Sequence, residues 1–208
     1  MLELANIDIN SVVTTYNSLA GVISSSQGLS ALSIILGLSG YSLRDLKGRV
    51  NLAKFIEKFK KELPEGTKNE TQESILSNSL VELQDYIKNS ENLDDNVFEK
   101  IGDIIINGIK NEDILTREYI KILKNLSWID LSVLLESYLI LKDLSIGTSC
   151  NQCSKHLKEK LHYPTELLVI SINKLYNFNL ILEQSSSWNI LGKTSLGENI
   201  CNLIKGEK

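Results

Sequence analysis

Apolar residues in the middle of the chain recur every three or four positions, which is the spacing of one face of an α-helix. The pattern runs through residues 52–63 and again through residues 76–87, and it predicts two amphipathic helices. A third helix is expected after Asp94 or Asp95, because a carboxylate there caps exposed N–H groups and favours the positive end of the helix. The apolar faces are expected to build a core from Leu52, Phe55, Ile56, Phe59, Leu63, Leu76, Leu80, Leu83, Ile87, Val97, Phe98, Ile101, Ile104 and Ile105.

Two further helices are predicted from the residues that would cap them. Thr116 is expected to be the N-cap of the first. Ser127 and Asp130 have the spacing of a capping box, in which each side chain bonds the backbone N–H of the other, and this pair opens the second helix.

The pattern changes after Ile146, where the apolar runs become short and turn residues become frequent. A turn and cap at residues 147–149 would lead into a short helix, and Pro164 would separate that helix from the next one. The elements expected here are the short helix before residue 162, a helix over 165–178, extended runs over 179–183 and 188–191, and a last helix capped by Ser195.

This order of helix, helix, helix, hairpin and helix is that of a winged helix. The sequence therefore predicts a mainly α protein in which an N-terminal helical bundle is followed by a C-terminal winged helix with a small β-hairpin. We expect the boundary between a helical domain, residues 1–126, and a winged-helix-like domain, residues 127–208.

The N-terminal region differs in having no charged residue between Asp8 and Arg44. Polar residues interrupt it too often for the roughly 20 apolar residues that a bilayer-spanning helix needs. Apolar positions at helical spacing instead favour a helical hairpin that faces the core or a partner. The alternative is a peripheral membrane effector that acts through residues 9–43.

Composition narrows the classes of function. The net charge is −4 and 42% of the residues are hydrophobic, so the chain is expected to fold as a globular protein without a surface that is basic overall. Its three cysteines do not form the even set of a secreted disulfide framework, and its acidic start lacks the positive region of a signal peptide. These features favour a cytoplasmic location.

A C-x-x-C motif lies close to both histidines. Two thiolates and two imidazoles could bind Zn²⁺, but the gap between the cysteines and the histidines is far shorter than in a zinc finger. Ordinary helix-start residues are the favoured interpretation, a thioredoxin-like redox pair is a weaker alternative, and no cofactor is expected. The candidate metal ligands are Cys150, Cys153, His156 and His162.

A winged helix suggests DNA binding, because its third helix can enter the major groove. The helix over 165–178 is expected to expose Glu166, Ser171, Asn173, Lys174 and Asn177, a set with one cation, although specific binders contact several phosphates. DNA binding is therefore the second hypothesis. Its candidate residues are Lys155, Lys158, Lys160, Asn173, Lys174 and Asn177.

Two further features bear on function. Trp188 lies beside three serines at the expected hairpin tip, where it would either anchor a protein partner or fold back onto the core. No histidine, acid and nucleophile are spaced as a catalytic triad, and no glycine-rich loop has the form that cradles a phosphate. We therefore expect neither an enzyme nor a small-molecule substrate.

Three segments resemble a known family. Residues 119–130 (YIKILKNLSWID) resemble the IxILKxLSxxDAxxL block of bacterial Abi-alpha proteins, which are named for abortive phage infection and are mostly of unknown function. Residues 175–181 resemble the LxxLGLI segment of that family, and residues 194–197 resemble the LTxxG that opens its last helix. The resemblance implies a bacterial accessory protein linked to phage defence and carries over no catalytic residue.

Together these features favour a non-enzymatic interaction protein. Its helical part would bind a protein partner or self-associate, and its winged helix would serve for protein docking. A DNA-binding transcriptional regulator is the alternative.

Overall fold

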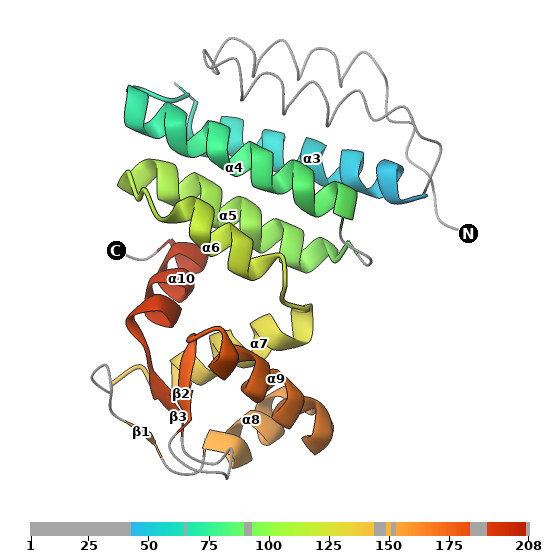
Figure 1. Ribbon diagram of the computed structural model, residues 1–208, viewed down its shortest axis with the longest axis vertical. Helices are drawn as coiled ribbons and strands as arrows, with labels where there is room; N and C mark the ends of the chain where they lie inside the picture. The colour runs from blue at the N-terminus through green and yellow to red at the C-terminus, as the bar shows by residue number, and fades with distance from the viewer. Residues whose placement is uncertain are drawn as a thin grey trace. The chain divides into compact units, whose positions relative to one another are not determined.

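The computed structural model describes residues 43–64, 66–89, 93–143, 149–150, 153–183 and 191–206 (Figure 1). These residues form eight helices and a small antiparallel sheet, so the mainly helical fold predicted from the sequence is confirmed. The predictions for residues 9–42 and for Trp188 lie outside the described residues. No helix in the described ranges is long and apolar enough to cross a membrane.

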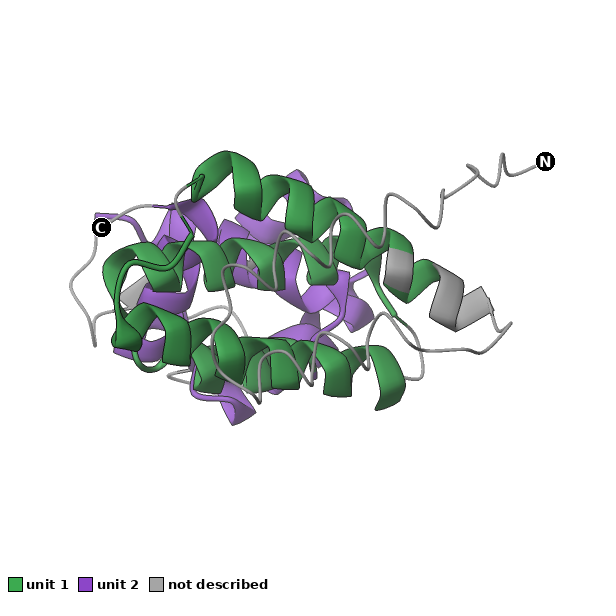
Figure 2. Cartoon of the chain, turned by 90° about the horizontal axis from the view of Figure 1, so that it is seen from above, with its two compact units in different colours: residues 1–124 green, residues 125–208 purple. Residues whose placement is uncertain are grey.

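The chain divides into two compact units, residues 1–124 and residues 125–208 (Figure 2). The division falls two residues before the boundary that the sequence predicts. We describe each unit by itself.

The described part of unit 1 contains four helices, which are α3 (Leu43–Glu62), α4 (Glu70–Asn89), α5 (Asp95–Asn111) and α6 (Thr116–Leu123). Helix α4 packs against α5 and α6, and α3 packs against α5. The apolar faces predicted from the sequence lie in this core, with only Leu63 half-buried just after the end of α3. The predicted amphipathic helices are therefore confirmed.

The ends of these helices follow local rules with one exception. Asp94 is the N-cap of α5 and accepts hydrogen bonds from the backbone N–H groups of Asn96 and Val97, as predicted. The prediction for Thr116 was wrong, because Leu115 is the N-cap of α6 and Thr116 is its first residue. A tight turn that begins at Asp113 leads the chain into α6. The Thr116 side chain is buried at this turn, and its hydroxyl donates to the Asp113 carbonyl.

Charged side chains also join the helices of unit 1. Glu82 of α4 accepts from Arg117 at 2.9 Å and from Lys124 at 2.8 Å, and Lys124 also pairs with Asp85. Burial by itself would raise the pKa of Glu82, but the hydrogen bonds from Lys124 and Arg117 outweigh it and hold the pKa below its ordinary value.

Unit 2 combines short helices with a small sheet. Its elements are α7 (Trp128–Ile140), β1 (Ser149–Cys150), α8 (Cys153–Leu161), α9 (Thr165–Asn177), β2 (Ile181–Glu183), β3 (Leu191–Lys193) and α10 (Ser195–Lys205). The strand order is β1-β3-β2, with both pairs antiparallel and with Gly192 opposite Leu182 on one side and Ser149 on the other. Helix α7 packs against α8, α9 and α10.

Three details of unit 2 differ from the sequence-based prediction. Ser149 and Cys150 were expected in a turn and a helix start, but they form β1, because their backbone pairs with β3. The second strand begins at Leu191, where the predicted run ended. Thr194 is the N-cap of α10 in place of Ser195, because its hydroxyl accepts from the Gly197 N–H at 3.0 Å.

Candidate functional site

Helix α9 is fixed within unit 2 by one buried carboxylate. Asp130 lies in the first turn of α7, where it forms the predicted capping box with Ser127. Its side chain also accepts from the Ser171 hydroxyl at 2.6 Å and from the Lys174 ammonium at 2.8 Å. The carboxylate therefore connects the start of α7 to two side chains of α9.

The electrostatic environment keeps this carboxylate ionised. Burial by itself would raise the pKa of Asp130, but hydrogen bonds from Lys174, Ser171 and Ser127 outweigh it and lower the pKa below its ordinary value. Asp130 is therefore charged at neutral pH, where it accepts from the Ser171 and Lys174 side chains of α9.

A buried tyrosine fixes the segment after α9. The Tyr138 hydroxyl lies 2.8 Å from the Leu180 carbonyl oxygen and accepts from the Thr194 N–H at 3.0 Å. A Cβ atom at Gly197 would overlap both the Leu180 carbonyl and the Tyr138 hydroxyl, so only glycine fits there. This close approach joins α7, the entrance to β2 and the start of α10.

The solvent-facing side of α9 is the candidate functional site, and we call it the α9 outward face. A helix turns about 100° per residue, so the buried side chains of α9, which include Leu168 and Leu175, lie on the side opposite Ile170. Ile170 is 61% exposed and is the most exposed large apolar side chain of α9. The exposed residues of this helix are Glu166, Leu167, Ile170, Asn173, Tyr176 and Asn177.

This face differs from the one expected from the sequence. Ser171 is buried and bonds Asp130, so the prediction that it is exposed was wrong. Lys174 is half-buried, and its ammonium also bonds Asp130. Asn173 and Asn177 are exposed, as expected. Among the exposed residues of α9 there is consequently one carboxylate and no cation.

The lysines of α8 are exposed, but they do not share one face. Lys155 and Lys158 lie one turn apart on the same side of α8, with Glu159 beside them. Lys160 is five residues after Lys155 and therefore lies about 140° around the helix from it. Glu159 lies next to Lys155 and Lys158, and Lys160 lies on another side of α8. The basic surface of α8 is therefore small for a site that binds a phosphate backbone.

The candidate metal ligands lie in different surroundings. Cys150 belongs to β1, and the orientation of its side chain is outside what the structure describes, whereas Cys153 is buried at the start of α8. The His156 ring lies 3.3 Å from Glu136, and exposed His162 follows α8 with a positive φ of 54°. Among the side chains that the structure describes, no three histidine, cysteine or acidic residues are grouped to hold a metal ion.

Sequence reasoning missed the apolar part of the α9 outward face. Leu167, Ile170 and Tyr176 were not singled out, although they lie off the core period of a helix whose sequence, TELLVISINKLYN, is apolar nearly all round. Apolar residues on both sides of a helix indicate either complete burial or a contact surface. The apolar residues on both sides of α9 were therefore the sequence feature that could have indicated this surface.

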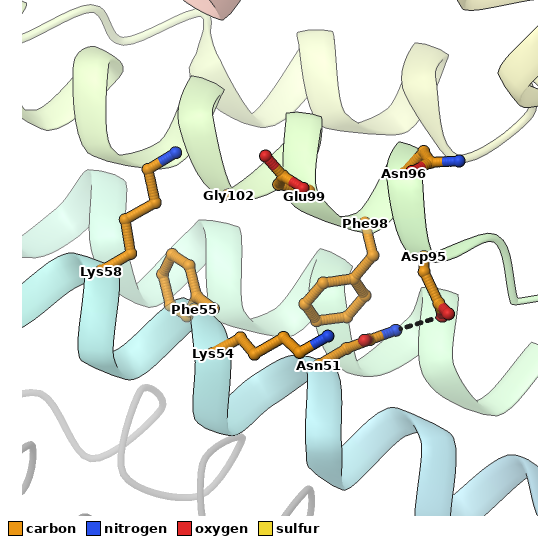
Figure 3. Close-up of a pocket in the computed structure, with 9 residues that line it drawn as sticks. All are labelled: Asn51, Lys54, Phe55, Lys58, Asp95, Asn96, Phe98, Glu99 and Gly102. Carbon is orange, nitrogen blue, oxygen red and sulfur yellow. Dashed lines mark hydrogen bonds between the residues drawn. The ribbon is translucent and has the colours of Figure 1, made fainter. Parts of the chain in front are cut away.

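A hollow lies within unit 1, between α3 and α5. It has a volume of about 280 Å³, and Figure 3 shows the rings of Phe55 and Phe98 between the two helices. Polar side chains surround these rings, and Asn51 donates to Asp95 at 2.8 Å. The residues that line the hollow are Asn51, Lys54, Phe55, Lys58, Asp95, Asn96, Phe98, Glu99 and Gly102.

Comparison with known proteins adds no relative to this description. No family model matches the sequence, and no curated protein or solved structure has significant similarity to it. Any function of this chain must therefore be inferred from its own residues.

Proposed function

We propose that this chain is a non-enzymatic interaction protein whose C-terminal unit is a winged helix that docks onto another protein through the α9 outward face. The observation that carries the proposal is the exposure of Ile170 at the centre of a face whose exposed residues include no cation. Lys174, which lies one turn from Ile170, is half-buried and is bonded to Asp130. An exposed apolar side chain with hydrogen-bonding neighbours is typical of the centre of a protein–protein contact.

The order of elements supports the winged-helix assignment. Helix α7, strand β1, helices α8 and α9, and the β2–β3 hairpin follow one another as three helices and a three-stranded sheet do in that fold. In this assignment α9 is the helix that would enter a DNA groove. Because a fold alone does not decide function, the side chains on the surface of α9 are what indicate whether its partner is DNA or protein.

The chemistry of α9 favours a protein over DNA as its partner. Phosphate binding depends on arginine and lysine side chains. Lys174, which is the only cation of α9, is held by a buried carboxylate. We expect the partner to present an apolar patch that contacts Ile170, with polar groups that contact the amides of Asn173 and Asn177.

DNA binding is the second candidate, and one observation favours it. Lys155 and Lys158 are exposed on α8, the helix that precedes α9, and asparagine side chains like those of α9 can pair with adenine. In that case both lysines would contact phosphates while α9 lies in the groove.

The link to phage defence rests on the resemblance to Abi-alpha proteins. In the segment that carries it, Tyr119 and Leu123 are buried, and Ser127 and Asp130 form the capping box. These roles are structural, so the proposal of a bacterial accessory protein in the cytoplasm needs its own test. Loss of protection against phage on deletion of the gene, measured as plating efficiency, would support it, and unchanged plating would remove it.

Photocrosslinking identifies what contacts the α9 outward face. A benzophenone amino acid replaces Ile170 and, as the control, Leu139, which is an exposed apolar residue of α7. We expect one dominant protein adduct at position 170 that is missing at position 139. The adduct protein is then purified, and Ile170→Asp should weaken its affinity for the unmodified chain by at least tenfold, the effect of a central contact.

Two results would contradict the proposal. One is an adduct with nucleic acid at position 170, which would favour the DNA-binding regulator. The other is a purified pair whose affinity Ile170→Asp leaves unchanged.

A further inference from the structure

The turn between α5 and α6 presents two consecutive apolar side chains to solvent. Ile114 is 77% exposed and Leu115 is 49% exposed. In the part of the chain that the structure describes, no other large apolar side chain is as exposed as that of Ile114. Apolar surface that is held out of the core in this way is typical of a contact with a partner.

Hydrogen bonds hold this turn in place. Glu112 ends α5 in a left-handed conformation, with a φ of 53°, and its carboxylate accepts from the Asn69 amide at 2.8 Å. The Asp113 carboxylate accepts from the Leu115 N–H at 2.9 Å. The position of Ile114 is therefore set by the fold of unit 1, and its exposure does not come from a lack of local contacts.

A separate hollow of about 410 Å³ lies between α4 and this turn. Its volume is within the roughly 300–1,000 Å³ of small-ligand pockets. Ile75 contributes little apolar surface, because it is 6% exposed, so the apolar group available to an occupant is the side chain of Ile114. Thr71, Ser74 and Asn78 add hydroxyl and amide groups along α4. The hollow therefore suits a short polar segment that carries one apolar side chain.

Arg117 gives this hollow a cation whose donors are only partly used. Its Nε atom donates to the buried Glu82 carboxylate at 2.9 Å. Among the described residues, no hydrogen bond or ion pair joins the two terminal amino groups of Arg117 to another side chain. A guanidinium binds a carboxylate through two parallel N–H···O bonds. Glu82 therefore orients Arg117 and leaves its terminal donors for a second carboxylate.

The only acid among the described lining residues lies at the far end of the hollow. Glu70 begins α4 and Glu82 follows 12 residues later, so their Cα atoms are about 18 Å apart along the helix axis at 1.5 Å per residue. Because Arg117 is bonded to Glu82, a carboxylate beside its guanidinium is well separated from Glu70. Lys124 also bonds Glu82 at 2.8 Å, so two cations share that carboxylate. The Arg117 end of the hollow therefore favours an anionic group.

We propose that this hollow binds a segment of another protein in which an apolar side chain lies next to a carboxylate. The apolar side chain packs against Ile114, and the carboxylate accepts from the terminal amino groups of Arg117. Two observations specify this occupant, because the exposed apolar side chain requires an apolar contact and the oriented guanidinium requires an anion. The site belongs to unit 1 and is separate from the α9 outward face, so it does not depend on the proposed function.

A capped peptide tests the proposal on the full chain. Amide chemical shifts are followed while acetyl-Ala-Leu-Asp-Ala-amide is added. We expect saturable shifts at Ser74, Ile114 and Arg117, with a dissociation constant on the order of 1 mM. Peptides with asparagine in place of the aspartate, or with serine in place of the leucine, should each bind at least about fivefold more weakly.

Two variants assign these effects to the hollow. Ile114→Ser should weaken binding of the peptide by at least about fivefold. Leu115→Ser, a change of the exposed apolar neighbour that does not line the hollow, is the matched control and should leave binding unchanged. Arg117→Gln should also weaken binding by at least about fivefold, and the aspartate and asparagine peptides should then bind equally, because the carboxylate has lost its partner. Lys124 still bonds Glu82 in this variant, and the amide spectrum shows whether the fold is retained.

Several outcomes would overturn the proposal. One is an absence of saturable shifts at up to about 10 mM peptide. Others are equal binding of the aspartate and asparagine peptides to the unmodified chain, and an Arg117→Gln protein that still distinguishes them. Shifts at Ile114 that depend on protein concentration without peptide would assign the hollow to a second copy of this chain in place of the proposed segment.

Discussion

The two units use buried carboxylates differently. In unit 1, Glu82 is surrounded by cations, since Arg117 and Lys124 both reach it from α6 or the residue just after it. In unit 2, two of the three side chains that donate to Asp130 are hydroxyls, those of Ser127 and Ser171, and the third is Lys174. Glu82 therefore pairs with two cations, whereas Asp130 binds two hydroxyls and one cation.

The lengths of the helices explain this difference. Helices α3 and α4 have 20 residues each, and their long apolar faces specify how they pack. No described helix of unit 2 exceeds 13 residues, and the described strands of this unit have two or three residues. Short elements bury less apolar surface, so single polar contacts carry more of the specificity in unit 2 than in unit 1.

The largest expected effect is at the close approach around Gly197. Gly197→Ala places a methyl group on the Leu180 carbonyl and the Tyr138 hydroxyl, and we expect it to lower the free energy of unfolding by about 3 kcal/mol. Urea denaturation measures the change. Ser195→Ala, an exposed neighbour, should leave stability within about 0.5 kcal/mol. A stable Gly197→Ala protein would show that these backbones are not fixed as described.

Removal of Asp130 and of Glu82 in separate variants tests the comparison directly. Asp130→Ala leaves two hydroxyls and one ammonium without their acceptor, and it should cost about 2–3 kcal/mol of unfolding free energy. Glu82→Ala should cost about 1 kcal/mol, because Arg117 can turn towards solvent and Lys124 keeps Asp85. If urea denaturation gives the same loss of unfolding free energy for Asp130→Ala and Glu82→Ala, the two units do not differ in how strongly they depend on these carboxylates.

Removal of the Tyr138 hydroxyl alone is a smaller change than removal of a carboxylate. Tyr138→Phe keeps the ring but leaves the Thr194 N–H and the Leu180 carbonyl without this partner, and it should cost about 1–2 kcal/mol. Tyr176→Phe on exposed α9 is the control for loss of a hydroxyl and should have no measurable effect on the urea midpoint. A neutral Tyr138→Phe would contradict the role given to this hydroxyl.

Acid should weaken both units gradually. The pKa values of Asp130 and Glu82 are lower in the folded protein than their ordinary values of 3.8 and 4.5, so their stabilisation is complete at neutral pH. It is lost as the pH falls below those ordinary values towards the lowered ones. Asp130→Asn should therefore flatten the fall in stability between about pH 5 and pH 3 by about 1 kcal/mol. If the free energy of unfolding, measured by urea titration, changes with pH equally in Asp130→Asn and in the unmodified protein, Asp130 does not contribute to the loss of stability in acid.

Local rules predicted much of the fold. The Asp94 cap and the Ser127–Asp130 capping box depend on neighbouring residues alone, and both are confirmed. Asn179 has a φ of 59°, in the left-handed region that asparagine tolerates. Features set within a few residues of sequence are therefore accessible without coordinates.

Features that depend on distant residues were missed. Strand β1 has two residues and pairs with β3 more than 40 positions away, so it has no periodicity of its own. The bond from Ser171 to Asp130 spans 41 positions and turns an apparently exposed serine inwards. Ile170 became a candidate only when the direction of the buried face was known, because Leu168, Val169 and Ile172 close to it are apolar as well.

The central claim is that the α9 outward face contacts protein and not DNA. Fluorescence anisotropy of a labelled duplex, titrated with the full chain at about 50 mM salt, tests it most directly, because low salt favours any phosphate contact. The account predicts no saturable rise in anisotropy up to about 10 µM protein, well within the range where nonspecific DNA binders associate. Salt-dependent binding that is lost in the double variant K155A/K158A would contradict it and assign this unit to DNA.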